Sequence, residues 1–135
     1  GYRAGLAACS RSFDINWLEH CPPTTQGGLE AALRLLERHP DLDAFLAYND
    51  LVAIGALQAC KAGWKSVPAE TAVIGADDIP LASLVTPSLS TLRVDLNSIG
   101  RLSLQLLLGL ISGKPETVSL KIEPQLILRE STGKL

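Results

Sequence analysis

The chain has 135 residues, of which 47% are hydrophobic and 19% charged, and its formal net charge at pH 7 is -2. That length suits one domain with a core of its own, and the nearly balanced charge excludes the basic surface typical of a nucleic-acid-binding domain. No segment approaches the roughly 18 uncharged apolar residues that a membrane span needs, and no signal peptide follows Gly1. The sequence therefore predicts a cytoplasmic globular domain.

Cysteine and methionine usage limits the possibilities further. Cys9, Cys21 and Cys60 are widely spaced and form no C-x-x-C pair, so we expect neither a disulfide framework nor a metal site, and no cofactor. The chain contains no methionine. Residues 1–8 have the composition of the body of a helix, with no capping residue before them. Both features suggest a piece of a longer protein.

The first half of the chain predicts helices alternating with strands. Residues 16–19 indicate a short strand. Leucines recur at helical spacing within 27–38, which predicts an amphipathic helix. Residues 43–48 are a short apolar run, typical of a parallel strand buried on both faces. A second helix over 50–62 is expected to end at Gly63, since glycine readily takes the positive φ of a C-terminal cap.

The second half continues the alternation. The expected elements are a strand over 71–75, a helical turn over 81–85, a strand over 89–95, a long helix over 96–111, and short strands over 118–122 and 126–128. This order predicts an α/β fold with an open, mostly parallel sheet and helices on both faces. Ligands of such folds bind beyond the carboxyl ends of the strands.

Polar pairs stand at two of these strand ends. Asn49-Asp50 follows the strand over 43–48, and Asp77-Asp78 follows the next strand, so both pairs are predicted to share one binding site at the same edge. Asp50 suits an N-terminal cap, whereas the amide of Asn49 can both donate to and accept from a hydroxyl-rich ligand. Asp77-Asp78 also suits a polar turn. Neighbouring carboxylates diverge, so we expect no catalytic acid and base here.

The helix over 50–62 is apolar nearly all round, which calls for two packing partners. One partner is the sheet, and a second subunit is the other partner we expect. Ile54 and Leu57 on this helix, together with Leu84 and Val85, are the predicted residues of a two-fold interface in a homodimer.

The same residues resemble a known family. "DAFLAYNDLVAIGALQACKAGWKSVPAETAVIGADDIPLASLVTPSLSTLRVD", followed by "SIGRLSLQLLLGLISGK" and "PQLILREST", is similar to the effector-binding core of the LacI/PurR (galactose repressor) family of bacterial transcription regulators. The resemblance implies a periplasmic-binding-protein-like type I module of two lobes that closes on a small effector, a sugar or nucleoside-like molecule. It also implies dimers, and operator DNA bound by a helix-turn-helix domain outside this chain.

Residue by residue, the resemblance implies that Asn49 and Asp77 bind the effector. Residues 1–135 would be part of the effector-binding domain, mainly its C-terminal lobe, while the helix within 96–113 would belong to the other lobe. That helix should then have lost its sheet partner, and should pack on a neighbouring chain or lie displaced.

Two positions depart from the family pattern. A stacking aromatic of several members falls on Pro22 or Pro23, and a polar site residue falls on Val94. With Asp78, Pro22 and Val94 are possible rim residues. Ring stacking should therefore be weaker here, and galactosides or purines cannot be assumed as ligands.

Two other functions fit some of these features. A periplasmic sugar-binding protein of a transporter shares the fold and the polar strand ends, although "LILREST" and "SLSTLRVD" favour the regulator. A small hydrolase could use Asp77 and Asp78, with a metal ion. The sequence leaves the effector, the operator and the direction of the response to ligand open.

Overall fold

The computed structural model describes residues 1–113 and 121–133. In chain order the elements are α1 (Tyr2–Ala8), the 3₁₀ helix η1 (Ile15–Trp17), α2 (Thr25–Arg38), β1 (Ala44–Leu46), α3 (Asp50–Ala62), β2 (Ala72–Ala76), η2 (Pro80–Ser83), β3 (Ser90–Arg93), α4 (Leu96–Ile111), β4 (Gln125–Ile127) and η3 (Glu130–Thr132).

The four strands form one sheet in the order β1-β2-β3-β4. β1, β2 and β3 are parallel, and β4 runs antiparallel to β3. Phe45 on β1 pairs with Val73 on β2, and Gly75 pairs with Thr91 on β3. The predicted open and mostly parallel sheet is confirmed.

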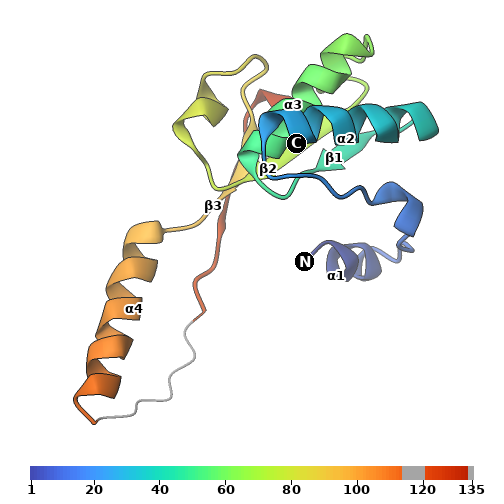
Figure 1. The fold of residues 1–135 in the computed structure, drawn as a ribbon. Helices are drawn as coiled ribbons and strands as arrows, with labels where there is room; N and C mark the ends of the chain where they lie inside the picture. The colour runs from blue at the N-terminus through green and yellow to red at the C-terminus, as the bar shows by residue number, and fades with distance from the viewer. Residues whose placement is uncertain (114–120, 134–135) are drawn as a thin grey trace.

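Two helices cover one face of this sheet as successive layers. α3 packs on β1 and β2, and α2 lies beside α3 (Figure 1). Glycines let the two helices touch backbone to backbone, because a Cβ on Gly55 would lie 2.2 Å from the carbonyl oxygen of Thr25, and one on Gly28 would lie 2.3 Å from that of Val52. The contact holds α2 directly against the N-terminal half of α3.

Helix α3 is apolar nearly all round because it packs on the sheet with one side and on α2 with another. Its second partner within the chain is α2, and Ile54 and Leu57 are only 6% and 8% exposed without any other subunit. The expectation that the helix needs a second subunit as its other packing partner is therefore wrong for these two side chains. Leu84, by contrast, is 75% exposed, so the predicted interface has one exposed apolar residue.

The C-terminal segment is bound to the sheet by buried hydroxyl groups. Ser131 is fully buried, donates its hydroxyl to the carbonyl oxygen of Val73 at 2.6 Å, and accepts from the amide of Ser90 at 2.8 Å. The segment after β4 is thus bound to β2 and β3 near their amino-terminal ends.

Several element boundaries differ from the sequence predictions. Residues 16–19 do not form a strand, because Asp14 caps the single turn η1 by accepting from the amide of Asn16 at 2.9 Å. Gly63 has an ordinary φ of -84°, and the positive φ after α3 falls on Trp64 instead. The strand expected over 118–122 lies largely outside the described residues. The helices over 50–62 and 96–111 have the predicted bounds.

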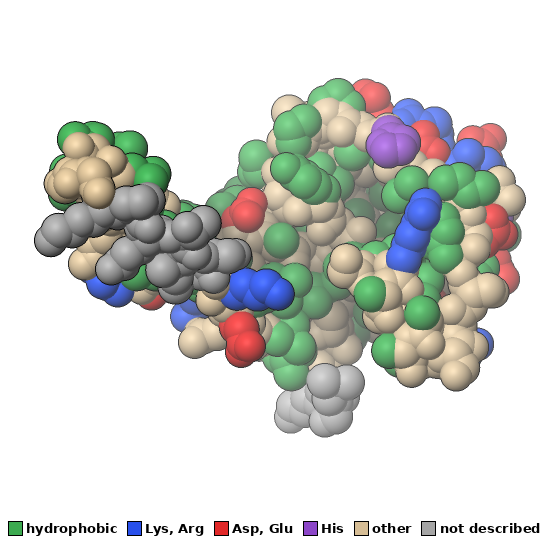
Figure 2. Space-filling view, turned by 90° about the horizontal axis from the view of Figure 1, so that it is seen from below, with side chains coloured by type: hydrophobic (Ala, Val, Ile, Leu, Met, Phe, Trp, Pro, Cys, Tyr) green, Lys and Arg blue, Asp and Glu red, His purple; other side chains and the backbone are tan. Residues whose placement is uncertain are grey.

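Helix α4 begins at a local cap, where the carboxylate of Asp95 accepts from the amide of Ser98 at 3.0 Å. None of its residues is buried, and Leu96 and Ile111 are each 73% exposed. Figure 1 shows it extending away from the sheet, and in Figure 2 hydrophobic side chains lie at the surface of that arm. What covers α4 stays a prediction. No helix in the described ranges is long and apolar enough to cross a membrane.

Candidate functional site

The candidate site lies at the carboxyl end of the parallel strands. β1 and β2 are neighbours, and their pairing continues past β1, because the amide of Ala47 donates to the carbonyl oxygen of Ile74 at 2.9 Å. Asn49 therefore leaves β1 at the same edge at which Asp77 leaves β2. The sheet topology brings the two predicted polar pairs to one edge.

Asn49 is the N-terminal cap of α3, a role that we had assigned to Asp50. Its side-chain oxygen accepts from the amide of Val52 at 2.9 Å, and its backbone is extended. The amide nitrogen of the side chain has no hydrogen-bond partner among residues 1–113 and 121–133. Asn49 can therefore cap the helix with its oxygen and still donate to a ligand.

Asp50 is a fully buried bridge between three segments of the chain. One carboxylate oxygen accepts from the hydroxyl of Thr91 at 2.6 Å, and the other accepts from the amide of Ile79 at 2.9 Å. Gly75 makes room for it, since a Cβ there would lie 2.3 Å from the nearer carboxylate oxygen. Sequence reasoning missed this bridge, although a glycine two residues before Asp77 is consistent with such a close approach.

The carboxylate of Asp78 is also occupied within the chain. It forms ion pairs with Arg93 at 2.5 Å and with Arg129 at 2.6 Å. Burial opposes its ionisation, but the hydrogen bonds and charges of Arg129 and Arg93 outweigh that effect and hold its pKa below the usual value. Asp78 therefore joins β3 to the C-terminal segment.

Asp77 differs from both of these acids. It is exposed, and no hydrogen bond or ion pair engages its carboxylate within the described part of the chain. Its φ is 106° and that of Asp78 is 52°, conformations that cost side-chain-bearing residues about 1–3 kcal/mol each. Of the three acids at this edge, Asp77 has the carboxylate available to a ligand.

The remaining predicted rim residues lie on adjoining segments. Pro22 is exposed just before α2. Its carbonyl oxygen lies close to Gly27, since a Cβ on Gly27 would be 2.4 Å from that oxygen. Val94 is half-buried directly after β3. Among residues 1–113 and 121–133, no group of three or more His, Cys, Asp or Glu side chains could hold a metal ion.

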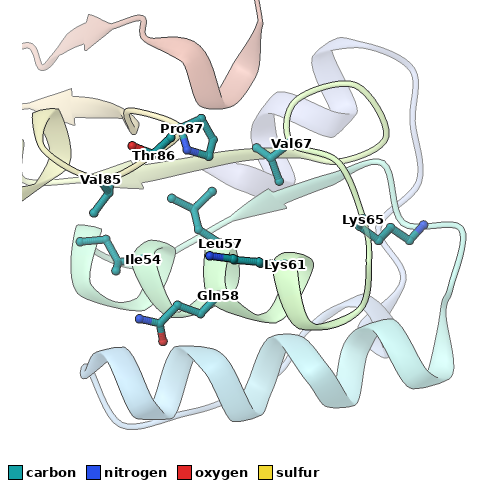
Figure 3. Close-up of a pocket in the computed structure, with 9 residues that line it drawn as sticks. All are labelled: Ile54, Leu57, Gln58, Lys61, Lys65, Val67, Val85, Thr86 and Pro87. Atoms are coloured by element: carbon teal, nitrogen blue, oxygen red, sulfur yellow. The ribbon is translucent and has the colours of Figure 1, made fainter.

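A separate open groove of about 370 Å³ runs along α3. It is lined by Ile54, Leu57, Gln58, Lys61, Lys65, Val67, Val85, Thr86 and Pro87 (Figure 3). The groove brings together three of the four predicted interface residues, and the exposed Leu84 directly precedes Val85 in the chain. It contains neither Asn49 nor Asp77.

Comparison with known proteins identifies the class of this fold. Residues 2–132 match the model of the periplasmic binding protein-like domain, and the chain belongs to that family in its LacI-type branch of transcription regulators. The HTH-type transcriptional regulator CelR of Thermobifida fusca is 34% identical over 132 residues, which are 97% of this chain and 39% of CelR.

Solved structures agree with that assignment. A LacI family regulator of Arthrobacter sp. FB24 in complex with lactose is 38% identical, with a TM-score of 0.81 over 96% of this chain and 48% of that one. A complex of CelR with cellobiose is 33% identical, with a TM-score of 0.88 over 96% of this chain and 40% of that one.

The chain thus spans about two-fifths to one-half of these relatives. They are transcription regulators and not enzymes, which agrees with the expectation that this protein is not an enzyme.

Proposed function

We propose that the chain is the sugar-sensing part of a cytoplasmic transcription regulator. The observation that carries the proposal is that the side-chain amide of Asn49 and the carboxylate of Asp77 follow neighbouring parallel strands at the same edge of the sheet, each without a partner in the described ranges. A carboxylate accepts from hydroxyl groups while an amide donates to them, so together they suit a polyhydroxylated ligand. Relatives in complex with lactose and cellobiose support a sugar of that kind.

In this proposal residues 1–135 contribute mainly the C-terminal lobe of the effector domain, and the helix within 96–113 belongs to the other lobe. Operator DNA binds to a helix-turn-helix domain outside these residues, in keeping with the relative CelR, an HTH-type regulator. Effector and DNA then influence each other's affinity through the coupling free energy between the two sites. The exposed apolar surface of α4 supports its contact with a segment other than this sheet.

The test is a thermal-shift and calorimetric titration of the full-length protein with cellobiose, lactose, galactose, ribose and adenosine. One sugar is expected to bind, and at a hundred times its dissociation constant it should stabilise by about 2.7 kcal/mol. The same sugar should change the affinity of the protein for genomic DNA fragments.

The matched variants are Asp77→Asn and Asp78→Asn. Asp77→Asn should lose most of the sugar affinity without loss of stability, since its carboxylate has no partner in the described chain. Asp78→Asn should lose stability, because it weakens two ion pairs. Preference for adenosine over every sugar, or sugar affinity unchanged in Asp77→Asn, would contradict the proposal.

We also propose that two copies pair through the groove along α3 that Ile54, Leu57 and Val85 line, together with the exposed Leu84 beside it. The open groove along α3 and the exposed Leu84 support this interface. Leu84→Glu is the better test, because Ile54 is buried and a charge there would disturb the fold. Leu84→Glu should sediment as a folded monomer, whereas a dimer that persists unchanged would place the interface elsewhere.

A further inference from the structure

The loop after β2 has an unusual backbone that needs support. Asp77 and Asp78 both have positive φ, at 106° and 52°. Two successive side-chain-bearing residues in this region are maintained only where surrounding contacts determine the conformation. The direction of the Asp77 side chain therefore depends on whatever holds the loop.

Three successive backbone amides of this loop are hydrogen-bonded. The amide of Asp77 donates to the carbonyl oxygen of Leu92 at 2.9 Å, that of Asp78 to the hydroxyl of Thr91 at 3.3 Å, and that of Ile79 to the carboxylate of Asp50 at 2.9 Å. The first bond continues the pairing of β2 with β3. The other two turn the chain away from the strand.

The hydrogen bonds of the Asp78 and Ile79 amides both lead to the carboxylate of Asp50. Ile79 reaches its carboxylate directly, and Thr91 accepts from Asp78 while it donates its own hydroxyl to Asp50 at 2.6 Å. A hydroxyl can do both, since it has one donor and two acceptor positions. Hydrogen bonds to a charged group are stronger than neutral ones, and burial strengthens them further.

Asp50 also follows Asn49 directly in the chain. The residue that holds the Asp77 loop is therefore covalently joined to the other candidate ligand group, and it is fully buried. Gly75 permits this arrangement, because any side chain there would collide with the Asp50 carboxylate. The distance and orientation between Asn49 and Asp77 thus depend on one buried acid.

We propose that Asp50, acting through Thr91, is a positioning residue of the effector site, which sets the orientation of Asp77 relative to Asn49 without touching the ligand. The idea rests on the proposed sugar-binding function of Asn49 and Asp77. It makes effector affinity depend on a carboxylate at the start of α3 that the ligand never meets.

The experiment compares Asp50→Asn, Thr91→Val and Thr91→Ser in the full-length protein. Thr71→Val is the matched control, because Thr71 is equally buried and its hydroxyl donates to the carbonyl oxygen of Leu42 at 3.0 Å, just before the other end of β2. The first readout is amide hydrogen exchange of Asp78 and Ile79 by NMR, and the second is the dissociation constant for cellobiose, lactose, galactose and ribose.

Asp50→Asn and Thr91→Val should accelerate exchange of both loop amides and weaken binding of the accepted sugar by about tenfold or more, since hydrogen bonds to a charged group are lost. Thr91→Ser keeps the hydroxyl, and should stay within about twofold of the wild type. Thr71→Val should lower stability and leave both the loop exchange and the sugar affinity unchanged. If Asp50→Asn does not fold, the two Thr91 variants decide.

Sugar affinity in Asp50→Asn or Thr91→Val within about twofold of the wild type would overturn the proposal, and so would unchanged exchange of Asp78 and Ile79. An equal loss of affinity in Thr71→Val would also overturn it, because affinity would then follow general stability. If the wild type binds none of cellobiose, lactose, galactose and ribose, the sugar function fails separately, and the exchange of the Asp78 and Ile79 amides alone supports or refutes the control of the loop by Asp50.

Discussion

Replacing Gly55 by alanine tests the close contact between α2 and α3. An added Cβ would lie 2.2 Å from the carbonyl oxygen of Thr25 and 2.4 Å from the amide nitrogen of Leu29. Both neighbours are backbone atoms, which cannot rotate away, so the helices must separate by roughly an ångström. Helix propensity favours alanine by about 1 kcal/mol, whereas overpacking of this kind costs about 1–3 kcal/mol and sometimes more.

We expect the steric effect to prevail, because separating the helices also disrupts the contact of Gly28 with Val52. Gly55→Ala should lower the free energy of unfolding by about 2 kcal/mol, measured by urea titration with circular dichroism at 222 nm. Gly100→Ala on α4 is the control, since nothing lies within 4 Å of a Cβ there. It should be neutral or stabilise by up to about 1 kcal/mol. Gly55→Ala as stable as the wild type would refute the inferred backbone contact.

Three further predictions concern single side chains. Asn49→Asp keeps a capping oxygen but loses the amide donor, so the free energy of unfolding from urea titration should stay within about 0.5 kcal/mol of the wild type while calorimetry shows sugar affinity reduced by about tenfold. Because the pKa of Asp78 is lowered in the folded protein, its charge stabilises the fold at pH values above the ordinary pKa, and this contribution is lost as the pH falls through the lowered value. In Asp78→Asn the free energy of unfolding should therefore fall less steeply with decreasing pH than in the wild type. An equally steep fall in both proteins would contradict the ion pairs. Burial raises the pKa of the Cys60 thiol to about 11, so this thiol should react with a disulfide reagent at pH 8 only after the protein unfolds. The exposed Cys9 should react at once in the native protein. Rapid labelling of all three cysteines in the native protein would argue against the described core.

The sequence alone determined the features that depend on near neighbours in the chain. The helices over 50–62 and 96–111 were predicted with their observed bounds, because apolar spacing and capping preferences act within one or two turns. Alternation of helices and strands was enough for the parallel sheet, and hence for the edge at which Asn49 and Asp77 emerge. Residues 16–19 were misjudged, because local propensity does not say whether a partner strand is present.

Only the tertiary structure decided how the four polar residues at that edge divide their roles. Asn49 and Asp50 are equally good caps in isolation, and the choice between them depends on Thr91 and Ile79, which lie 41 and 29 residues further along the chain from Asp50. Asp77 and Asp78 are likewise indistinguishable in sequence, until Arg129, 51 residues beyond Asp78, neutralises one of them. Hydrogen bonds and ion pairs between distant segments form only once packing has brought those segments together, so the pattern of neighbouring residues carries no record of them.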